Sequence, residues 1–281
     1  MLMNLRYDVA KVRVMKAIAY ILLTFYALTC LGPLIWSLMS ALKSNDEILV
    51  HPFNIPKALL FQNFSQAWVE GHIAFYFKNT VIYVILATGV LLLIAPMASY
   101  VVARVLRSNV LYVYFTLGIM IPIHTILLPS LILMRTFHLV NTRLSLTLLY
   151  IAFNLSIAVF ILGGFMKSIP KEFEEVAFID GASRARTFFE IIFPLSRPAI
   201  ATVGLLTIIG NWNAYLLPLI IITDTRLMVI TQGLQNLKGM YAMDYGLTCA
   251  GLVITFMPMV VVYILFQEQV IAGLTTGGLK H

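Results

Sequence analysis

The chain has 281 residues, of which 60% are hydrophobic and 11% are charged, and its formal net charge is +7. A soluble domain carries about 25% charged residues, so this composition excludes an ordinary soluble protein and indicates that lipid is the solvent. The positive charge does not indicate nucleic-acid binding, because Lys and Arg in the loops of a membrane protein set its orientation. An all-α membrane protein is therefore expected.

Residues 1–16 are predicted to form an amphipathic interfacial helix. Leu2, Leu5, Val9 and Val12 recur at helical spacing with basic residues around them, a pattern typical of a helix lying on the membrane surface. Residues 17–281 are predicted to form a single transmembrane domain. A cleaved signal peptide is the alternative for the first apolar run, but this run is longer than the usual roughly 7–15 residues.

Six apolar stretches approach or exceed the roughly 20 residues that a helix needs to cross the hydrocarbon core. The predicted spans are residues 17–39, 79–103, 110–134, 144–166, 199–222 and 246–266. Two mixed polar stretches, 41–77 and 223–245, are predicted to be external loops.

Basic residues predict which loops face the cytoplasm. If the N terminus lies inside, twelve Lys and Arg residues fall on the inner side and seven on the outer side. Cytoplasmic loops carry the excess of these residues. We therefore expect both termini and residues 169–198 to be cytoplasmic.

Residues 169–198 hold the densest cluster of charge in the chain. Pro170 lies where a helix can begin, and three glutamates follow near the positive end of the helix dipole. Gly181 is predicted to end this helix, and a second short helix with an apolar stripe is predicted to end at Pro194 and Pro198. Two interpretations stay open: a hairpin folded against its own membrane helices, or a knob that enters a groove on a soluble partner.

The same stretch resembles the EAA loop of ABC importer permeases. The resemblance is carried by Glu175-Val176-Ala177, Asp180-Gly181-Ala182, Phe188 with Ile192, and Pro194-Leu195. Val176 stands where alanine is common in that family. Shorter motifs are similar to the carbohydrate-uptake branch, in particular its MalG-like subunits: Pro33 with Trp36, Ser40 and Lys43; Asn63-Phe64; Asn79-Thr80; Met120-Ile121-Pro122; Trp212-Asn213; Pro218-Leu219; and Gly273-Leu274-Thr275.

This resemblance implies a type I importer fold with six transmembrane helices, in the cytoplasmic membrane of a bacterium or archaeon. It implies four kinds of partner or cargo: a second permease in a heterodimer, two cytoplasmic ATPase subunits that bind ATP and Mg²⁺, an external solute-binding protein, and a sugar or oligosaccharide. It further implies that the EAA residues couple the chain to the ATPase. These are Glu175, Val176, Ala177, Asp180, Gly181, Ala182, Phe188 and Pro194. An importer of polyamine, phosphate or peptide is the alternative cargo class.

The sequence carries no pattern of an enzyme. It has no P-loop of the form GxxxxGK[ST], its five histidines lack metal-ligand spacing, and no nucleophile lies beside a base. An intramembrane enzyme is therefore only a distant alternative. We expect ATP hydrolysis on a separate subunit, and no cofactor, metal or nucleic acid bound to this chain.

Polar residues inside the spans indicate either hydrogen bonds between helices or a solute pathway. Amides beside an aromatic ring suit a sugar, which binds through hydrogen bonds and stacking. The candidate pathway residues are Asn211, Trp212, Asn213, His124 and Asn154. Neither interpretation is excluded by the sequence.

The second external loop resembles the family loop that reaches into the binding protein. Its candidate contact residues are Gln232, Gly233, Gln235 and Asn236. A plain polar linker is the alternative.

Overall fold

The computed structural model describes residues 2–240 and 244–278, and the side chains of residues 11–235 and 244–267. Within these ranges every regular element is a helix. Four helices are long and apolar enough to cross a membrane, and two bent helix pairs raise the number to six if each pair is one span. The predicted all-α membrane fold is confirmed.

One bent pair replaces the predicted third span. Helices α5 (Asn109–Met120) and α6 (Ile123–Thr136) meet at 100°. Ile121 between them is extended, with ψ of 116°, because the residue before a proline disfavours the helical region. Pro122 therefore breaks the span locally, whereas Pro129 lies inside α6.

The chain divides into two compact units. The first unit, residues 1–71 and 237–256, contains α1 (Leu2–Ser40), α2 (Asn45–Val50) and α3 (Gln62–Val69). Helix α1 runs without interruption through both the predicted interfacial segment and the predicted first span. The start of α14 (Tyr245–Gly278) also belongs here, and the Asn45 Oδ1 accepts a hydrogen bond of 2.7 Å from the Tyr245 N–H.

Buried polar side chains hold the loop after α1 in place. Lys43 is fully buried, and its Nζ donates to the carbonyls of His51 and Pro52 at 3.2 and 3.1 Å. The Asn63 amide donates to the carbonyls of Ala41 and Lys43, both at 3.0 Å. These bonds give the loop's carbonyls partners that water would otherwise supply.

The second unit, residues 72–236 and 257–281, is built on three packed helices. They are α4 (Ile73–Tyr100), α7 (Arg143–Ser168) and α11 (Arg197–Trp212). One apolar cluster joins all three and includes Leu91, Leu162 and Val203. A second joins α4 and α7 to the short helix α12 (Leu216–Ile221), around Tyr83 and Leu146.

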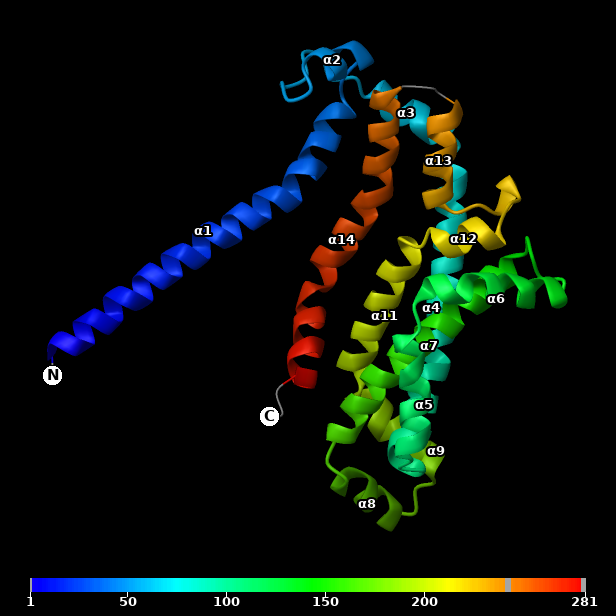
Figure 1. The fold of residues 1–281 in the computed structure, drawn as a ribbon. Coiled ribbons are helices and arrows are strands. Elements are labelled where there is room, and N and C mark those ends of the chain that lie inside the picture. The colour runs from blue at the N-terminus through cyan, green and yellow to red at the C-terminus, as the bar shows by residue number, and fades with distance from the viewer. Residues whose placement is uncertain (1, 241–243, 279–281) are drawn as a thin grey trace. The chain divides into compact units, whose positions relative to one another are not determined.

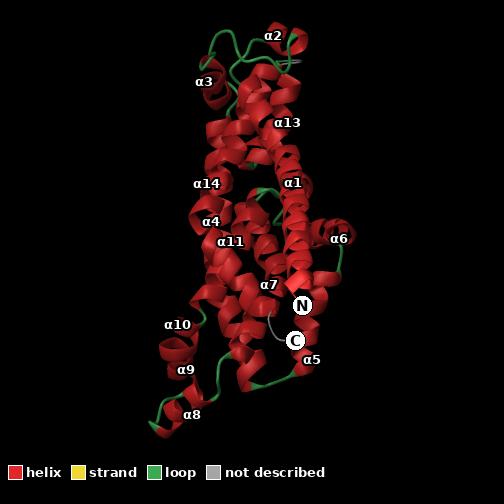
Figure 2. Cartoon of the chain, turned by 90° about the vertical axis from the view of Figure 1, so that its left-hand side faces the viewer, coloured by secondary structure: helices red, strands yellow, loops and turns green. Residues whose placement is uncertain are grey.

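Short helices lie at the two ends of this unit (Figures 1 and 2). After α4 comes a π-helical turn, η1 (Val101–Val105). The polar stretch forms α8 (Glu172–Ile179), α9 (Arg184–Thr187), a second π-helical turn η2 (Phe188–Ile192) and α10 (Phe193–Leu195). Towards the other end lie η3 (Thr225–Leu227) and α13 (Ile230–Met240).

The second helix of the polar stretch ends between Pro194 and Pro198, as the sequence suggested, because the helical run from Arg184 stops at Leu195 and α11 begins at Arg197 after a bend of 72°. Pro194 lies inside α10 and Pro198 lies in the first turn of α11. Both prolines occupy first-turn positions, where a proline is tolerated because its missing N–H has no helical partner.

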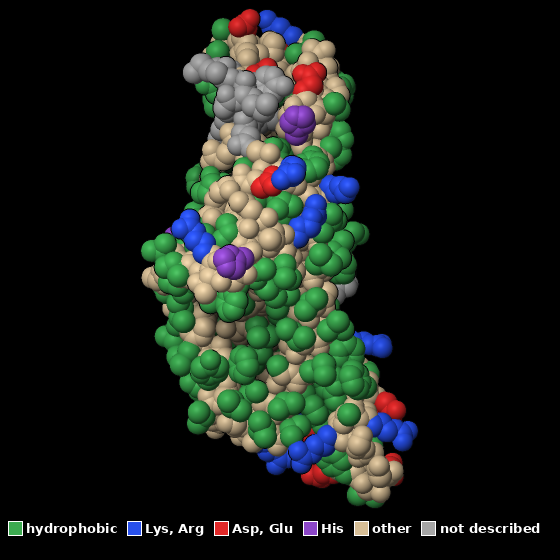
Figure 3. Space-filling model, turned by 90° about the vertical axis from the view of Figure 1, so that its right-hand side faces the viewer, with side chains coloured by type: hydrophobic (Ala, Val, Ile, Leu, Met, Phe, Trp, Pro, Cys, Tyr) green, Lys and Arg blue, Asp and Glu red, His purple; other side chains and the backbone are tan. Residues whose placement is uncertain are grey.

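Large apolar side chains remain exposed over much of the chain. On the face drawn in Figure 3, hydrophobic side chains cover a broad area. Lipid rather than water is the solvent that suits such a surface.

Candidate functional site

Helix α8 presents apolar side chains outward. Val176 and Ile179 are 58% and 85% exposed, and Phe173 and Phe178 are exposed as well. Charged side chains flank this surface, which a membrane interior would not accommodate. Such a face in a water-filled compartment is typical of a protein contact.

Gly181 shapes the turn that follows α8. Its φ is +77°, in the left-handed region that favours glycine. The Ala182 N–H donates to the Ala177 carbonyl at 2.9 Å and the Gly181 N–H to the Phe178 carbonyl at 3.1 Å. This pattern closes a helix C-terminus as in a Schellman motif, so the predicted helix end at Gly181 agrees with the geometry.

The remaining residues of the EAA pattern occupy different environments. Glu175 and Asp180 are exposed on α8 and just after it, while Ala177 is buried. Phe188 is buried in the chain's own apolar cluster, with its ring centroid 5.2 Å from that of Tyr100. Pro194 is half-buried.

Sequence reasoning missed the buried ion pair between Arg104 and Glu174. The Arg104 Nε donates to the Glu174 Oε2 at 2.8 Å, and both residues are 7% exposed. In the sequence Arg104 looked like one more inner-loop charge, and Glu174 looked like one of three equivalent glutamates. The sequence did contain a signal for this burial, because Glu174 lies three residues before Ala177 and therefore shares a helix face with a small apolar residue.

A cavity of about 400 Å³ brings together three of the predicted pathway residues: Asn154, Asn211 and Asn213. The Asn154 Nδ2 donates to the Asn211 Oδ1 at 2.9 Å, which joins α7 to α11. The Asn211 Nδ2 is buried and has no hydrogen-bond partner in the described chain. The cavity is therefore lined by a hydrogen bond between helices, and one of its lining residues keeps a buried amide nitrogen without a partner among the described residues.

Trp212 and His124 lie apart from these amides. Trp212 is buried, and its ring meets Phe77 edge-to-face at a centroid distance of 5.3 Å. It lines a separate apolar cavity of about 430 Å³ with Phe77 and Pro258. His124 is exposed at the start of α6.

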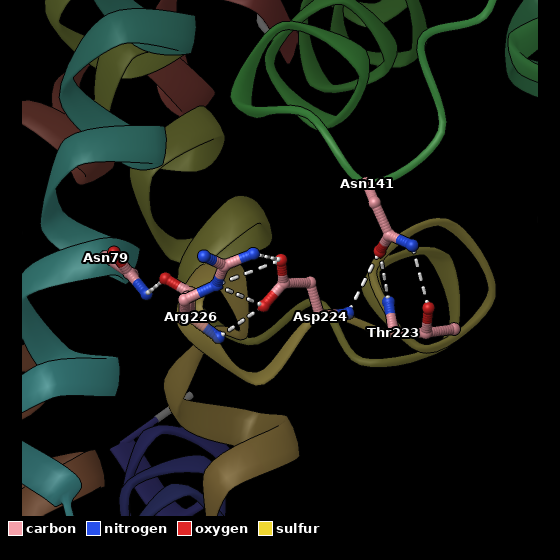
Figure 4. A network of polar contacts seen from close by, with 5 residues as sticks. All are labelled: Asn79, Asn141, Thr223, Asp224 and Arg226. Carbon is pink, nitrogen blue, oxygen red and sulfur yellow. Dashed lines mark hydrogen bonds and ion pairs between the residues drawn. The ribbon is translucent and has the colours of Figure 1, made fainter.

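Hydrogen bonds from polar side chains join the loop around η3 to α4 and to the turn before α7 (Figure 4). The buried Asn79 of α4 donates to the carbonyls of Arg226 and Met228 at 3.1 and 3.0 Å and accepts from Arg143 at 3.0 Å. The Asn141 Oδ1 accepts from the N–H groups of Thr223 and Asp224 at 2.6 and 3.0 Å.

Asp224 and Arg226 form an ion pair at 2.8 Å in the same loop, in which Arg226 is exposed and Asp224 is half-buried. The hydrogen bonds from Arg226 hold the pKa of Asp224 below its ordinary value. The folded pKa is lowered, so the pair is complete at neutral pH and is lost only as the pH falls through that pKa.

The predicted binding-protein residues differ in exposure. Gln232 is buried, and its side chain bonds the backbone of Ile222 at 2.9 Å and that of Val229 at 3.2 Å. Gly233 is buried against the Tyr76 ring. Gln235 is exposed, and the Asn236 side chain lies outside the described residues.

Among the described residues no group of three or more His, Cys, Asp or Glu side chains is arranged to hold a metal ion. The two cysteines, Cys30 and Cys249, are free.

The sequence matches the family of binding-protein-dependent transport system inner membrane components over residues 91–274. It is 36% identical to the diacetylchitobiose uptake system permease protein NgcG of Streptomyces coelicolor, over 93% of this chain and 88% of that protein. It is 31% identical to the trehalose/maltose transport system permease protein MalG of Thermococcus litoralis, over 98% and 99% of the two chains. The fold is similar to a chain of a bacterial ABC transporter involved in alginate import, with a TM-score of 0.76, 21% identity and coverage of 91% and 96%.

The chain therefore belongs to the binding-protein-dependent transport system inner membrane components. This confirms the resemblance to ABC importer permeases and the multi-pass location in the inner membrane. The chain is a transport component of this kind rather than an enzyme.

Proposed function

We propose that this chain is one of two permease subunits of an ABC importer for a sugar or oligosaccharide. The observation that carries this is similarity over nearly the whole chain to permeases named for diacetylchitobiose and for trehalose or maltose uptake. The proposed partners are a second, different permease, two cytoplasmic ATPase subunits that bind ATP and Mg²⁺, and an external binding protein.

The proposed coupling element is α8 with the turn at Gly181. Its exposed apolar side chains, Val176 and Ile179, suit a groove on the ATPase, and Glu175 and Asp180 lie exposed beside them. Ala177, Ala182, Phe188 and Pro194 are proposed to support this element from behind, since none of them is fully exposed.

Co-purification with the cognate ATPase tests this assignment. Glu175→Lys reverses an exposed charge, and Gly181→Asp places a side chain at φ +77°, which costs about 1–2 kcal/mol for an L-residue. Both variants are expected to stay in the membrane and to retain less ATPase. For Gly181→Asp the strain of the turn corresponds to a loss of about tenfold. Undiminished ATPase binding and stimulation in both variants would show that residues 169–198 are only structural.

The proposed topology has both termini and α8 in the cytoplasm. The loop around η3 then lies outside, as the excess of inner Lys and Arg favours. Gln235 is exposed beside that loop and is the proposed contact for the binding protein. Gln232 and Gly233 are proposed to hold the loop in shape, and Asn236 remains a candidate contact.

The proposed solute pathway passes the cavity lined by Asn154, Asn211 and Asn213, because carboxamides suit a polyhydroxylated solute. Trp212 and His124 do not line this cavity, and they would contact the solute only in a pathway that extends beyond it. Competition for uptake of a labelled oligosaccharide by sugars, polyamines, phosphate and peptides separates the proposed cargo from the alternatives. Competition by a non-sugar alone would overturn the sugar assignment.

A further inference from the structure

Arg104 lies where three segments of the second unit meet. It belongs to the π-helical turn η1 at the end of α4. Its Nη1 donates to the Ile169 carbonyl after α7 at 2.9 Å, and its Nε donates to Glu174 of α8 at 2.8 Å. A cation at the C-terminus of α7 also faces the negative end of that helix dipole. One guanidinium thus joins two membrane helices to α8.

The ion pair is the main buried side-chain attachment of α8. Only Glu174 and Ala177 of this helix are buried. The apolar cluster at this end is formed by residues such as Tyr100, Met166 and Ile192, and it contains no α8 residue among those described. The large apolar side chains of α8 are exposed instead, so packing alone holds this helix weakly.

The surroundings of the pair leave room for α8 to shift. A cavity of about 320 Å³ adjoins Arg104 and Glu174 and is also lined by Arg107, Phe178 and Arg184. A π-helical turn such as η1 is a frequent feature of functional sites, because it widens the helix and re-aims its side chains.

Helix α4 carries contacts at both of its ends. Near its start, Asn79 bonds the loop around η3, the Thr80 Oγ1 accepts from the Ile230 N–H at 2.8 Å, and the Tyr83 hydroxyl donates to the Leu227 carbonyl at 3.1 Å. The helix has 28 residues and is therefore about 42 Å long. It links the Arg104 site to the η3 loop through one continuous helix, which contains Pro96 near its C-terminal end.

We propose that the Arg104–Glu174 ion pair is the positioning contact that passes movement of α8 to α4 and so to the η3 loop. The inference rests on the proposed function, because α8 must first bind the ATPase. When ATP binding displaces α8, the buried pair moves η1 with it, since separating two buried charges is strongly unfavourable.

The test uses the whole transporter, with its partner permease, ATPase and binding protein, and three variants. Arg104→Gln and Glu174→Gln each leave one buried charge unpaired. The double variant removes both charges and keeps two amides that can hydrogen-bond. It leaves no buried charge unpaired, so a fall in stimulation or uptake in this variant is not explained by misfolding. Glu190→Gln is the matched control, because the Arg186–Glu190 pair has a similar separation of 2.9 Å but is 64% and 60% exposed.

Three measurements are made: ATPase retained on purification, ATP hydrolysis with and without loaded binding protein, and solute uptake. We expect the double variant to retain the ATPase and its basal hydrolysis, while stimulation and uptake fall about tenfold, a typical coupling between sites. Glu190→Gln is expected to resemble the wild type in all three.

Wild-type stimulation and uptake in the double variant would overturn the inference. So would loss of the ATPase itself from a double variant present at normal level in the membrane, because the pair would then serve docking rather than transmission. If the wild-type chain itself retains no ATPase, the proposed function fails, and that outcome is seen before any variant is compared.

Discussion

Replacing Asn79 with alanine is expected to destabilise the second unit by at least about 1–3 kcal/mol. The Asn79 amide donates to two carbonyls, those of Arg226 and Met228, and its oxygen accepts from Arg143. Asn79 is 1% exposed, so water cannot readily replace these bonds. A buried polar group left without a partner costs about 1–3 kcal/mol. Thermal unfolding of the purified protein measures the effect.

Asn79→Asp tests the two donated hydrogen bonds separately from the bond with Arg143. Aspartate keeps the size and the bond with Arg143 but places an oxygen against the carbonyls of Arg226 and Met228. It is expected to destabilise the protein as well and to speed tryptic cleavage after Arg226, whose side chain is exposed. Asn109→Ala, at an exposed position that begins α5, is the control and should change little. Equal stability of Asn79→Asp and the wild type would contradict the assigned bonds.

The second large effect is expected from Gly233→Val. A Cβ at Gly233 would overlap the Tyr76 ring, with Cγ at 2.7 Å and Cε2 at 2.8 Å. Tyr76 is itself buried, so its ring has little room to move. Overpacking of this kind costs about 1–3 kcal/mol. We expect a lower unfolding temperature and lower uptake, because α13 can no longer pack on α4.

Gly164→Ala is the matched control for this substitution. Its added Cβ meets only the Tyr112 hydroxyl, at an ordinary distance of 3.9 Å. Stability is expected to be unchanged or slightly higher, since alanine favours a helix over glycine by about 1 kcal/mol. Tyr76→Ala combined with Gly233→Val is expected to relieve part of the overlap. A Gly233→Val protein as stable as the wild type would show that the two residues do not pack closely.

The local sequence was sufficient for features that depend on neighbouring residues. The apolar runs predicted a helical membrane protein, because a chain in lipid must satisfy its backbone internally. Gly181 predicted the end of α8, because glycine has no Cβ and can adopt the left-handed conformation that closes a helix. Pro122 marked an interruption, but its bend of 100° depends on the packing of the two helices it joins.

The EAA pattern identified the class of protein, whereas the roles of its neighbours required the fold. Glu174 and Glu175 are adjacent and chemically identical, yet one is buried and the other exposed. The difference is set by Arg104, which is 70 residues away in the chain. No periodicity within α8 specifies that partner.

The fold also places neighbouring polar residues of the spans in different environments. The sequence placed Asn211 and Trp212 together as amide and ring, but adjacent helical residues point about 100° apart. Asn211 meets Asn154 of α7, and Trp212 meets Phe77. Gln232 likewise looked like a surface contact and is buried because its amide binds the backbone of its own loop. The sequence by itself determined the class of protein, its all-helical membrane character and the position of the α8 turn. Only the tertiary structure decided which polar groups are buried, because their partners come from distant segments.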